Sequence, residues 1–257
     1  MNRLRHFRLC WIIELADAWI IALNYCPELL PMSLLPSSHF HGYALALHTS
    51  SPELGLALSN FSGDSRCGVW DLGRSLSTDL HNYLQDFLQP QGWQDLTFLA
   101  VAKGPGGFTG TRIGVVTART LAQQLNLPLF AVSSLAAFAN SMRDRRLNEA
   151  GSNAANHAVD IAVQMPAQRG ELFTAIYSSL DPTQACTALF PDTVLSAEQW
   201  QQVLEQWPRP YQLLQADGGL GRSATSLLQL AEREWCDGLR PAWTDALPFY
   251  GQHPIVG

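Results

Sequence analysis

Phe98-Leu-Ala-Val-Ala-Lys-Gly-Pro-Gly-Gly-Phe-Thr-Gly-Thr-Arg-Ile-Gly114 is the most informative segment of this sequence. Its first five residues are apolar and have the length of a strand that is buried on both faces of a sheet. The glycines that follow let the backbone turn tightly and approach another chain segment or a phosphate group. A helix that begins here would present unpaired N–H groups at its N-terminus. The segment therefore predicts a strand, a tight corner and a helix.

Two interpretations of this glycine-rich corner are open, a phosphate site and a tight turn that lets the helix pack closely. Lys103 precedes the glycines, whereas the lysine of a P-loop follows them, and the spacing is not G-x-G-x-x-G. Composition alone therefore favours the tight turn. Arg112 would bind a phosphate or a partner's acidic group, or would brace the loop. The residues singled out in the corner are Gly104, Gly106, Gly107, Thr109, Gly110, Arg112 and Gly114.

The segments around the corner predict an α/β domain with a mixed sheet. Alternating apolar residues over 43–58, interrupted by Thr49-Ser50-Ser51-Pro52, predict a β-hairpin, and a third strand is expected over 67–72. Leucines at every fourth position predict an amphipathic helix over 72–88. A helix over 111–125, a strand over 129–132 and a helix capped by Ser133 or Ser134 follow.

The second half of the sequence has a coarsely similar order of strands and helices, without an internal sequence repeat. Residues 143–157 are charged and then rich in Ala, Ser and Asn, which predicts a connector. Strands are expected at 159–163, 172–177 and 213–214, with helices at 197–206 and 223–235. We expect an N-terminal extension over 1–41, an N-terminal half over 42–145 and a C-terminal half over 146–257. Trp200, Trp207, Trp235 and Trp243 are expected in the core.

Composition excludes several classes of protein. Apolar residues make up 47% and charged residues 15% of the chain, which excludes an intrinsically disordered protein. A net charge of −6 argues against binding nucleic acid mainly through the chain's own phosphate contacts. Five cysteines without a C-x-x-C pair indicate neither a disulfide framework nor a thiolate metal site, which fits a reducing compartment.

The N-terminus imitates a signal peptide, because basic residues precede an apolar run over 9–26. Glu14 and Asp17 interrupt this run, and each acid would be costly inside a membrane. We therefore expect a cytoplasmic protein without a membrane anchor.

The glycine-rich corner and Val132-Ser133-Ser134-Leu135 together resemble the TsaB (YeaZ) family of bacterial tRNA threonylcarbamoyladenosine synthesis. The resemblance extends over about residues 42–257. It includes residues 46–58, the helix at 76–88, the segment Gln168-Arg-Gly-Glu-Leu-Phe173 and the segment Ala246-Leu-Pro-Phe-Tyr250. It implies an ASKHA (actin-like or sugar-kinase-like) fold with two related halves, each a mixed sheet with helices.

The function implied by the resemblance is that of a noncatalytic subunit. Such a subunit pairs with a TsaD-like catalytic subunit and, with a TsaE-like ATPase, supports threonylcarbamoyl transfer to N6 of adenosine 37 in tRNAs that read codons beginning with A. It meets tRNA indirectly and could form a homodimer when alone. We expect no catalytic residue and no cofactor. The side of the chain that faces TsaD is implied to include Leu76, Leu80, His81, Leu84, Ile113, Val116 and Leu121.

Two departures from the family pattern affect the predicted chemistry. The first strand ends His48-Thr49-Ser50 where the family usually has Asp-Thr-Ser, so the oxygen ligand that Mg²⁺ prefers is missing. Pro166-Ala167-Gln168-Arg169 replaces the common Asp-Ala-Arg. Arg169 and Glu171 are expected on one strand, where they would form an exposed ion pair.

We expect no metal site, because His39 and His41 are the one close histidine pair and two-apart histidines do not share a helix face. Two alternatives remain open at this point. One is a stand-alone ASKHA ATPase, kinase or acyl transferase that uses the glycine-rich corner and Thr49 for nucleotide. The other is a structural or chaperone-like homodimer.

Overall fold

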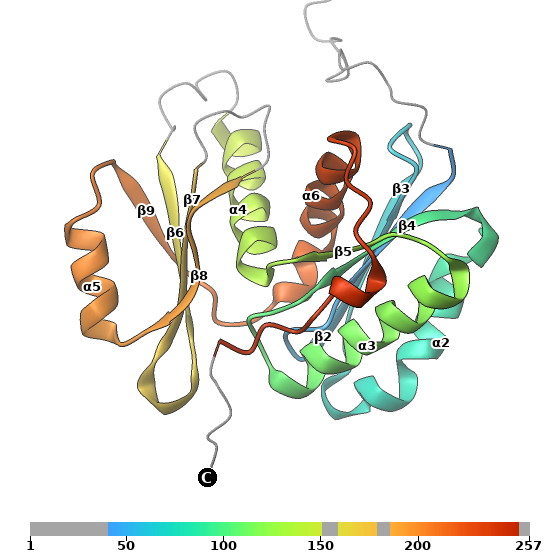
Figure 1. Cartoon of the computed structure of the whole chain (residues 1–257), viewed down its shortest axis with the longest axis horizontal. Helices are drawn as coiled ribbons and strands as arrows, with labels where there is room; N and C mark the ends of the chain where they lie inside the picture. The colour runs from blue at the N-terminus through green and yellow to red at the C-terminus, as the bar shows by residue number, and fades with distance from the viewer. Residues whose placement is uncertain (1–40, 151–158, 179–185, 252–257) are drawn as a thin grey trace, which may run out of the picture. The chain divides into compact units, whose positions relative to one another are not determined.

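Two mixed β-sheets form the framework of the computed structural model, which describes residues 41–150, 159–178 and 186–251 (Figure 1). The strands are β1 Tyr43–His48, β2 Glu53–Ser59, β3 Ser65–Asp71, β4 Leu96–Ala102, β5 Leu129–Val132, β6 Asp160–Pro166, β7 Leu172–Ser178, β8 Thr187–Leu195 and β9 Tyr211–Gln215. The first sheet has the order β3-β2-β1-β4-β5 and the second has the order β8-β7-β6-β9.

The second sheet repeats the topology of the first sheet without a counterpart of β5. β1 pairs antiparallel with β2 and parallel with β4, and β6 pairs in the same way with β7 and β9. In both sheets a third strand extends the hairpin at one edge. The predicted α/β class, with two related mixed sheets, is confirmed.

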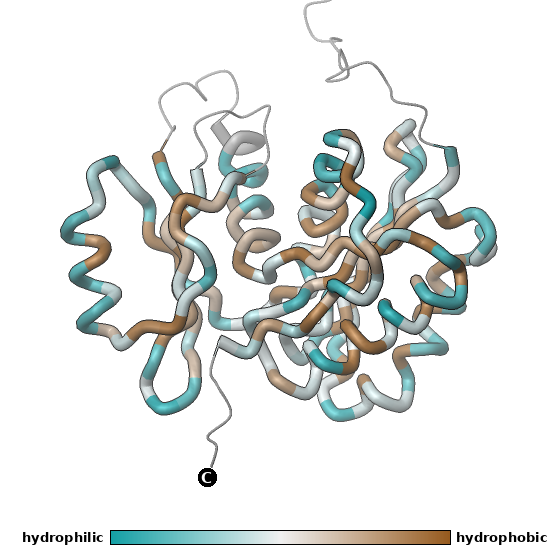
Figure 2. Tube along the Cα trace, viewed as in Figure 1, coloured by the Kyte–Doolittle hydropathy of each residue, from teal (hydrophilic) through white to brown (hydrophobic). Residues whose placement is uncertain are grey.

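Helices cover both faces of the first sheet. α2 (Leu76–Leu88) and α3 (Phe108–Leu125) pack on one face, where their apolar residues join Leu45, Leu47 and Leu99 in a buried cluster. α6 (Ala224–Cys236) packs on the opposite face against Phe98 and Phe130. Figure 2 shows hydrophobic and hydrophilic residues alternating along α2 and α3, as expected of helices with one buried face.

The second sheet is also covered on both faces. α4 (Ser134–Ala150) packs on one face and contacts α6, whereas α5 (Ala197–Glu205) packs on the other face through Trp200 and Leu204 (Figure 1). Ser133 caps α4 as predicted, because its Oγ accepts hydrogen bonds from the N–H groups of Leu135 and Ala136 at 3.1 and 3.2 Å. Short 3-10 helices are η1 Gly73–Ser75, η2 Trp93–Asp95, η4 Gln168–Gly170, η5 Leu220–Ser223 and η6 Trp243–Asp245.

Two predictions about local structure need correction. The expected connector over 143–157 is helical as far as Ala150, where α4 ends, and residues 151–157 lie outside the described residues. Its Arg, Leu, Glu and Ala residues favour a helix without any apolar period. Arg169 and Glu171 do not lie on a strand, because Arg169 has a φ of 60° within η4 and Glu171 ends that turn.

Other expected features have mixed outcomes. β8 was not predicted, since Pro191 interrupts its pattern, and proline is tolerated because β8 is an edge strand. Trp200 is buried, and Trp207, Trp235 and Trp243 are partly buried against apolar clusters. The domain boundaries stay a prediction, and residues 1–40 of the expected extension lie outside the described residues.

Arg66 of β3 caps the C-terminal end of α2 through hydrogen bonds from its side chain. Its guanidinium donates hydrogen bonds to the carbonyl oxygens of Phe87, Leu88 and Gln89 at 2.9 to 3.1 Å. These carbonyls include orphan acceptors at the helix end, which need partners.

We expect Arg66→Ala to lower the free energy of unfolding by about 2 kcal/mol, because charged hydrogen bonds are lost. Arg66→Lys should recover less than half of that loss, since an ammonium group cannot reproduce the planar fork. Urea unfolding of both variants measures the change in the free energy of unfolding. Arg74→Ala, at an exposed residue of η1, is the control, and an equal effect of Arg74→Ala and Arg66→Ala would contradict the capping role.

Candidate functional site

The glycine-rich corner packs directly against the turn that joins β1 and β2. The Gly107 N–H donates a hydrogen bond to the Ser50 carbonyl oxygen at 2.8 Å. Thr49 Oγ1 donates to the Gly110 carbonyl oxygen at 2.8 Å. Thr49 and Ser50 are both buried. The corner therefore binds a segment of its own chain.

Four of the corner glycines have no room for a side chain, and at Gly104 a Cβ atom would lie 2.6 Å from the Phe249 carbonyl oxygen. A Cβ atom at Gly106 or Gly110 would lie 2.2 Å from the carbonyl oxygen of Ser50 or Thr49, respectively. A Cβ atom at Gly114 would lie 2.1 Å from Thr49 Oγ1. These contacts support the close-packing interpretation of the corner, because the backbone of α3 touches the end of the hairpin turn.

His48 ends β1 beside this contact and is completely buried. Burial lowers the pKa of its imidazole to about 3, so the side chain is neutral near pH 7. The Ser50 N–H donates to His48 Nδ1 at 3.5 Å, and among the described residues Nε2 has no hydrogen-bond partner. A neutral imidazole therefore occupies the position at which the resemblance predicts a carboxylate.

The predicted partner face on α2 needs a partial correction. Leu76, Leu80 and Leu84 are only 3 to 4% exposed and pack into the chain's own core with Leu45 and Leu47. Their four-residue spacing places them on the helix face that covers the first sheet. They pack between α2 and the first sheet, so they cannot contact another protein in this conformation.

The exposed residues of this flank lie mainly on α3. Val116 and Phe108 are each 53% exposed, and Ile113 and Leu121 are half-buried. His81 is exposed on α2 among polar neighbours. The Phe108 ring lies 4.6 Å from the Tyr250 ring, so the C-terminal segment adjoins the start of α3. Phe108 and Tyr250 were not singled out from the sequence, because Phe108 stands at a helix start and Tyr250 in no helix or strand, and no periodicity marks such positions.

Arg112 and Thr109 are also exposed on the first turns of α3. Their position leaves both interpretations of Arg112 open, since no described contact shows it bracing the corner. In the described ranges, no three His, Cys, Asp or Glu side chains lie where they could together hold a metal ion. None of the helices described is both long and apolar enough to cross a membrane.

Comparison with known proteins assigns a family to this fold. The tRNA threonylcarbamoyladenosine biosynthesis protein TsaB of Bacillus subtilis (strain 168) is 32% identical over 181 residues, covering 68% of this chain and 72% of the relative. The chain belongs to the TsaB family. The TsaB protein of Escherichia coli (strain K12) is 31% identical over 174 residues, covering 64% of this chain and 67% of the relative.

Other comparisons agree with TsaB membership. The family described as TsaD, tRNA N6-adenosine threonylcarbamoyltransferase, matches residues 74–171, which include the corner. YeaZ from Pseudomonas aeruginosa superposes with a TM-score of 0.63 at 24% identity, covering 81% of this chain and 99% of that structure. A second structure is described as an uncharacterized protein with similarity to peptidase YEAZ from Pseudomonas aeruginosa. It gives a TM-score of 0.65 at 24% identity, covering 82% of this chain and 100% of that structure. The predicted resemblance to the TsaB (YeaZ) family and the predicted α/β fold are thereby confirmed.

Proposed function

We propose that this TsaB-family chain is the noncatalytic subunit that pairs with a TsaD-like catalytic subunit. In this role it supports N6-threonylcarbamoylation of adenosine 37 in tRNAs that read codons starting with A. A TsaE-like ATPase joins through the complex, and the tRNA is met indirectly. The relatives named for this pathway support the biosynthetic role.

One observation carries the noncatalytic role. The corner at which a nucleotide phosphate would be expected is filled by Thr49 and Ser50 of the same chain. The neutral, buried His48 beside it supplies no carboxylate for Mg²⁺. Both features favour a structural role for the corner, which fixes the position of α3.

The outward side of α3 is the surface that we assign to the TsaD-like subunit. Val116 exposes half of its side chain, with half-buried Ile113 and Leu121 nearby on the helix and His81 on α2. Apolar side chains at the centre of an interface contribute most of the binding energy. The close packing at Gly110 and Gly114 holds this helix in place for such contact.

The test measures pairing of the full chain with the TsaD-like protein of the same organism. Val116→Asp should weaken binding about 30-fold or more, because a charge would be buried against apolar surface. Val69→Asp is the matched control: Val69 is 40% exposed, and its neighbour Trp70 packs on α2, so Val69 lies on the opposite sheet face.

Reconstituted modification gives a second measurement. The chain alone should transfer no threonylcarbamoyl group, and adding it to the TsaD-like and TsaE-like proteins should be required for activity. Turnover of ATP by the chain alone, or equal loss of pairing in the two valine variants, would contradict the proposal. A homodimer that persists at equal concentrations of the TsaD-like protein would also contradict it.

A further inference from the structure

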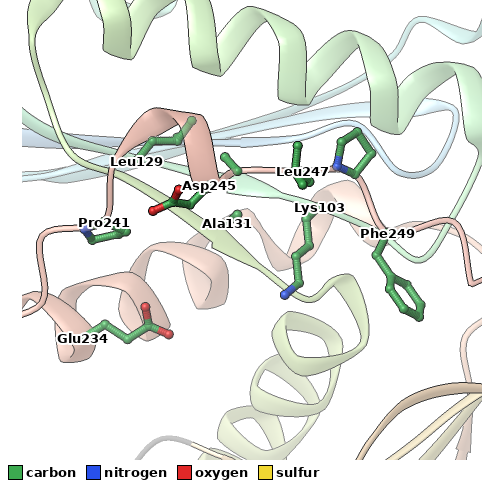
Figure 3. Close-up of a pocket in the computed structure, with 10 residues that line it drawn as sticks. Lys103, Leu129, Ala131, Glu234, Pro241, Asp245, Leu247 and Phe249 are labelled. Atoms are coloured by element: carbon green, nitrogen blue, oxygen red, sulfur yellow. The ribbon is translucent and has the colours of Figure 1, made fainter.

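A cavity of about 400 Å³ opens where β4 and β5 end, between α6 and the segment that leads from η6 toward Tyr250 (Figure 3). Its charged residues are Lys103, Glu234 and Asp245, and its apolar residues include Leu129, Ala131 and Leu247. The volume falls within the range of small-molecule sites, roughly 300–1,000 Å³. Its lining includes neither α2 nor the outward face of α3.

Lys103 is the single lysine of the chain, among 16 basic residues. Figure 3 shows its ammonium group on one side of the cavity and the carboxylates of Glu234 and Asp245 on the other. In the described part of the chain, neither Lys103 nor Glu234 forms an ion pair. The cavity thus presents one cation and two anions whose charges are separated across it.

Lys103 is partly buried, whereas Glu234 and Asp245 are exposed residues. Partial burial raises the pKa of Glu234, although the nearby Lys103 charge opposes this rise. Leu129 is buried beneath the cavity, and Leu247 is 60% exposed at its rim. Between the charged groups a ligand would therefore meet an apolar surface, which suits a chain of methylene groups.

The charge arrangement selects the class of ligand. A simple anion would meet two carboxylates, and a polyamine would meet the Lys103 ammonium group. An apolar molecule would pair with none of the three charges and would exclude water from them, which is costly. A molecule with one carboxylate, two cationic groups and an aliphatic stem satisfies every charged group of the cavity.

We propose that this cavity binds an amino acid with a cationic side chain. Its carboxylate pairs with Lys103, its α-ammonium and side-chain cation pair with Glu234 and Asp245, and its stem lies against Ala131 and Leu247. This site goes beyond the proposed function and does not depend on pairing with a TsaD-like subunit.

Calorimetry on the full chain tests the proposal with L-arginine as the probe. Two matched comparators each remove one group: agmatine lacks the carboxylate, and L-citrulline replaces the guanidinium with a neutral urea. We expect saturable binding of L-arginine and about tenfold weaker binding of each comparator, equivalent to about 1.4 kcal/mol. No saturation below about 10 mM, or equal binding of all three compounds, would overturn the proposal.

The single lysine gives an independent readout of where the probe binds. Protein labelled with ¹³C-lysine has one lysine side chain to observe by NMR, and its Cε signal should shift with the Kd found by calorimetry. A calorimetric signal without any shift would place the ligand elsewhere and refute the assignment.

Variants complete the test. Lys103→Met and Glu234→Gln should each weaken L-arginine binding about tenfold. Glu205→Gln, on α5 outside the cavity, should leave it unchanged. Circular dichroism checks that each variant is folded. Glu234 is an exposed residue, so its variant keeps the test decisive if Lys103→Met does not fold. Unchanged affinity in a folded Glu234→Gln variant would overturn the proposal.

Discussion

Gly110→Ala is expected to lower the free energy of unfolding by about 2–3 kcal/mol, a large loss for one methyl group. The new Cβ atom would lie 2.2 Å from the Thr49 carbonyl oxygen. The Cβ atom is fixed to the backbone of α3, and the Thr49 carbonyl oxygen is itself a backbone atom. The clash therefore cannot be relieved by rotation of a flexible side chain. α3 must shift away from β1, which breaks the hydrogen bond from Thr49 Oγ1 to Gly110 O. Without this contact, alanine would stabilise a helix by up to about 1 kcal/mol relative to glycine.

Gly107→Ala provides the matched control within the same corner. A Cβ atom at Gly107 would lie 3.7 Å from the Ser50 carbonyl oxygen, an ordinary contact, and its φ of −59° suits alanine. We expect a change within about 0.5 kcal/mol. Urea unfolding of both variants measures the difference. Because α3 must move, Gly110→Ala should also weaken pairing with the TsaD-like subunit. Equal stability of the two variants would mean that close packing does not account for the glycines.

The second large effect is a loss of stability at acidic pH that originates from His48. Its pKa is lowered by burial from the ordinary 6.5 to about 3 in the folded chain. Below about pH 6.5 the unfolded chain therefore binds a proton that the folded chain does not bind. Stability from this residue is complete above the unfolded pKa and declines as pH falls toward about 3, by at most about 1.4 kcal/mol per pH unit.

His48→Asn isolates this contribution. Asparagine keeps an acceptor for the Ser50 N–H and does not titrate, so its packing cost is independent of pH. The folded chain also contains Glu232, whose pKa burial raises to about 7 and which acts in the opposite direction. Glu232 is present in both proteins and cancels in their difference. Between about pH 6 and pH 4 the wild-type chain should lose about 1.4 kcal/mol more per pH unit than the variant. Parallel pH profiles would show that His48 titrates normally.

Much of the fold was predictable, because periodicity reports burial directly. The leucines of α2 recur at every fourth residue and all face the first sheet. The continuous apolar run of β4 is buried on both faces. Where burial is weak, the pattern disappears: β8 is an edge strand with a central proline, and the end of α4 consists of polar helix formers.

The site was less predictable than the fold. Clustered glycines indicate close approach, but sequence does not name the partner, which proved to be Thr49 and Ser50 some 60 residues earlier in the chain. A leucine stripe is compatible with a core or with an interface, and the burial of these leucines in one cluster with residues of the first sheet decides for the core. For Lys103 the available signal was that the chain has no other lysine.

The placement of α6 has a consequence for synthesis. The face of the first sheet that contains Phe98 and Phe130 is covered by residues 224–236, which come after both sheets in the sequence. As the protein leaves the ribosome, the strands of this sheet emerge long before their cover exists. The apolar face of the nascent first sheet therefore stays uncovered until α6 has been synthesised, an interval in which a ribosome-bound chaperone would prevent its aggregation.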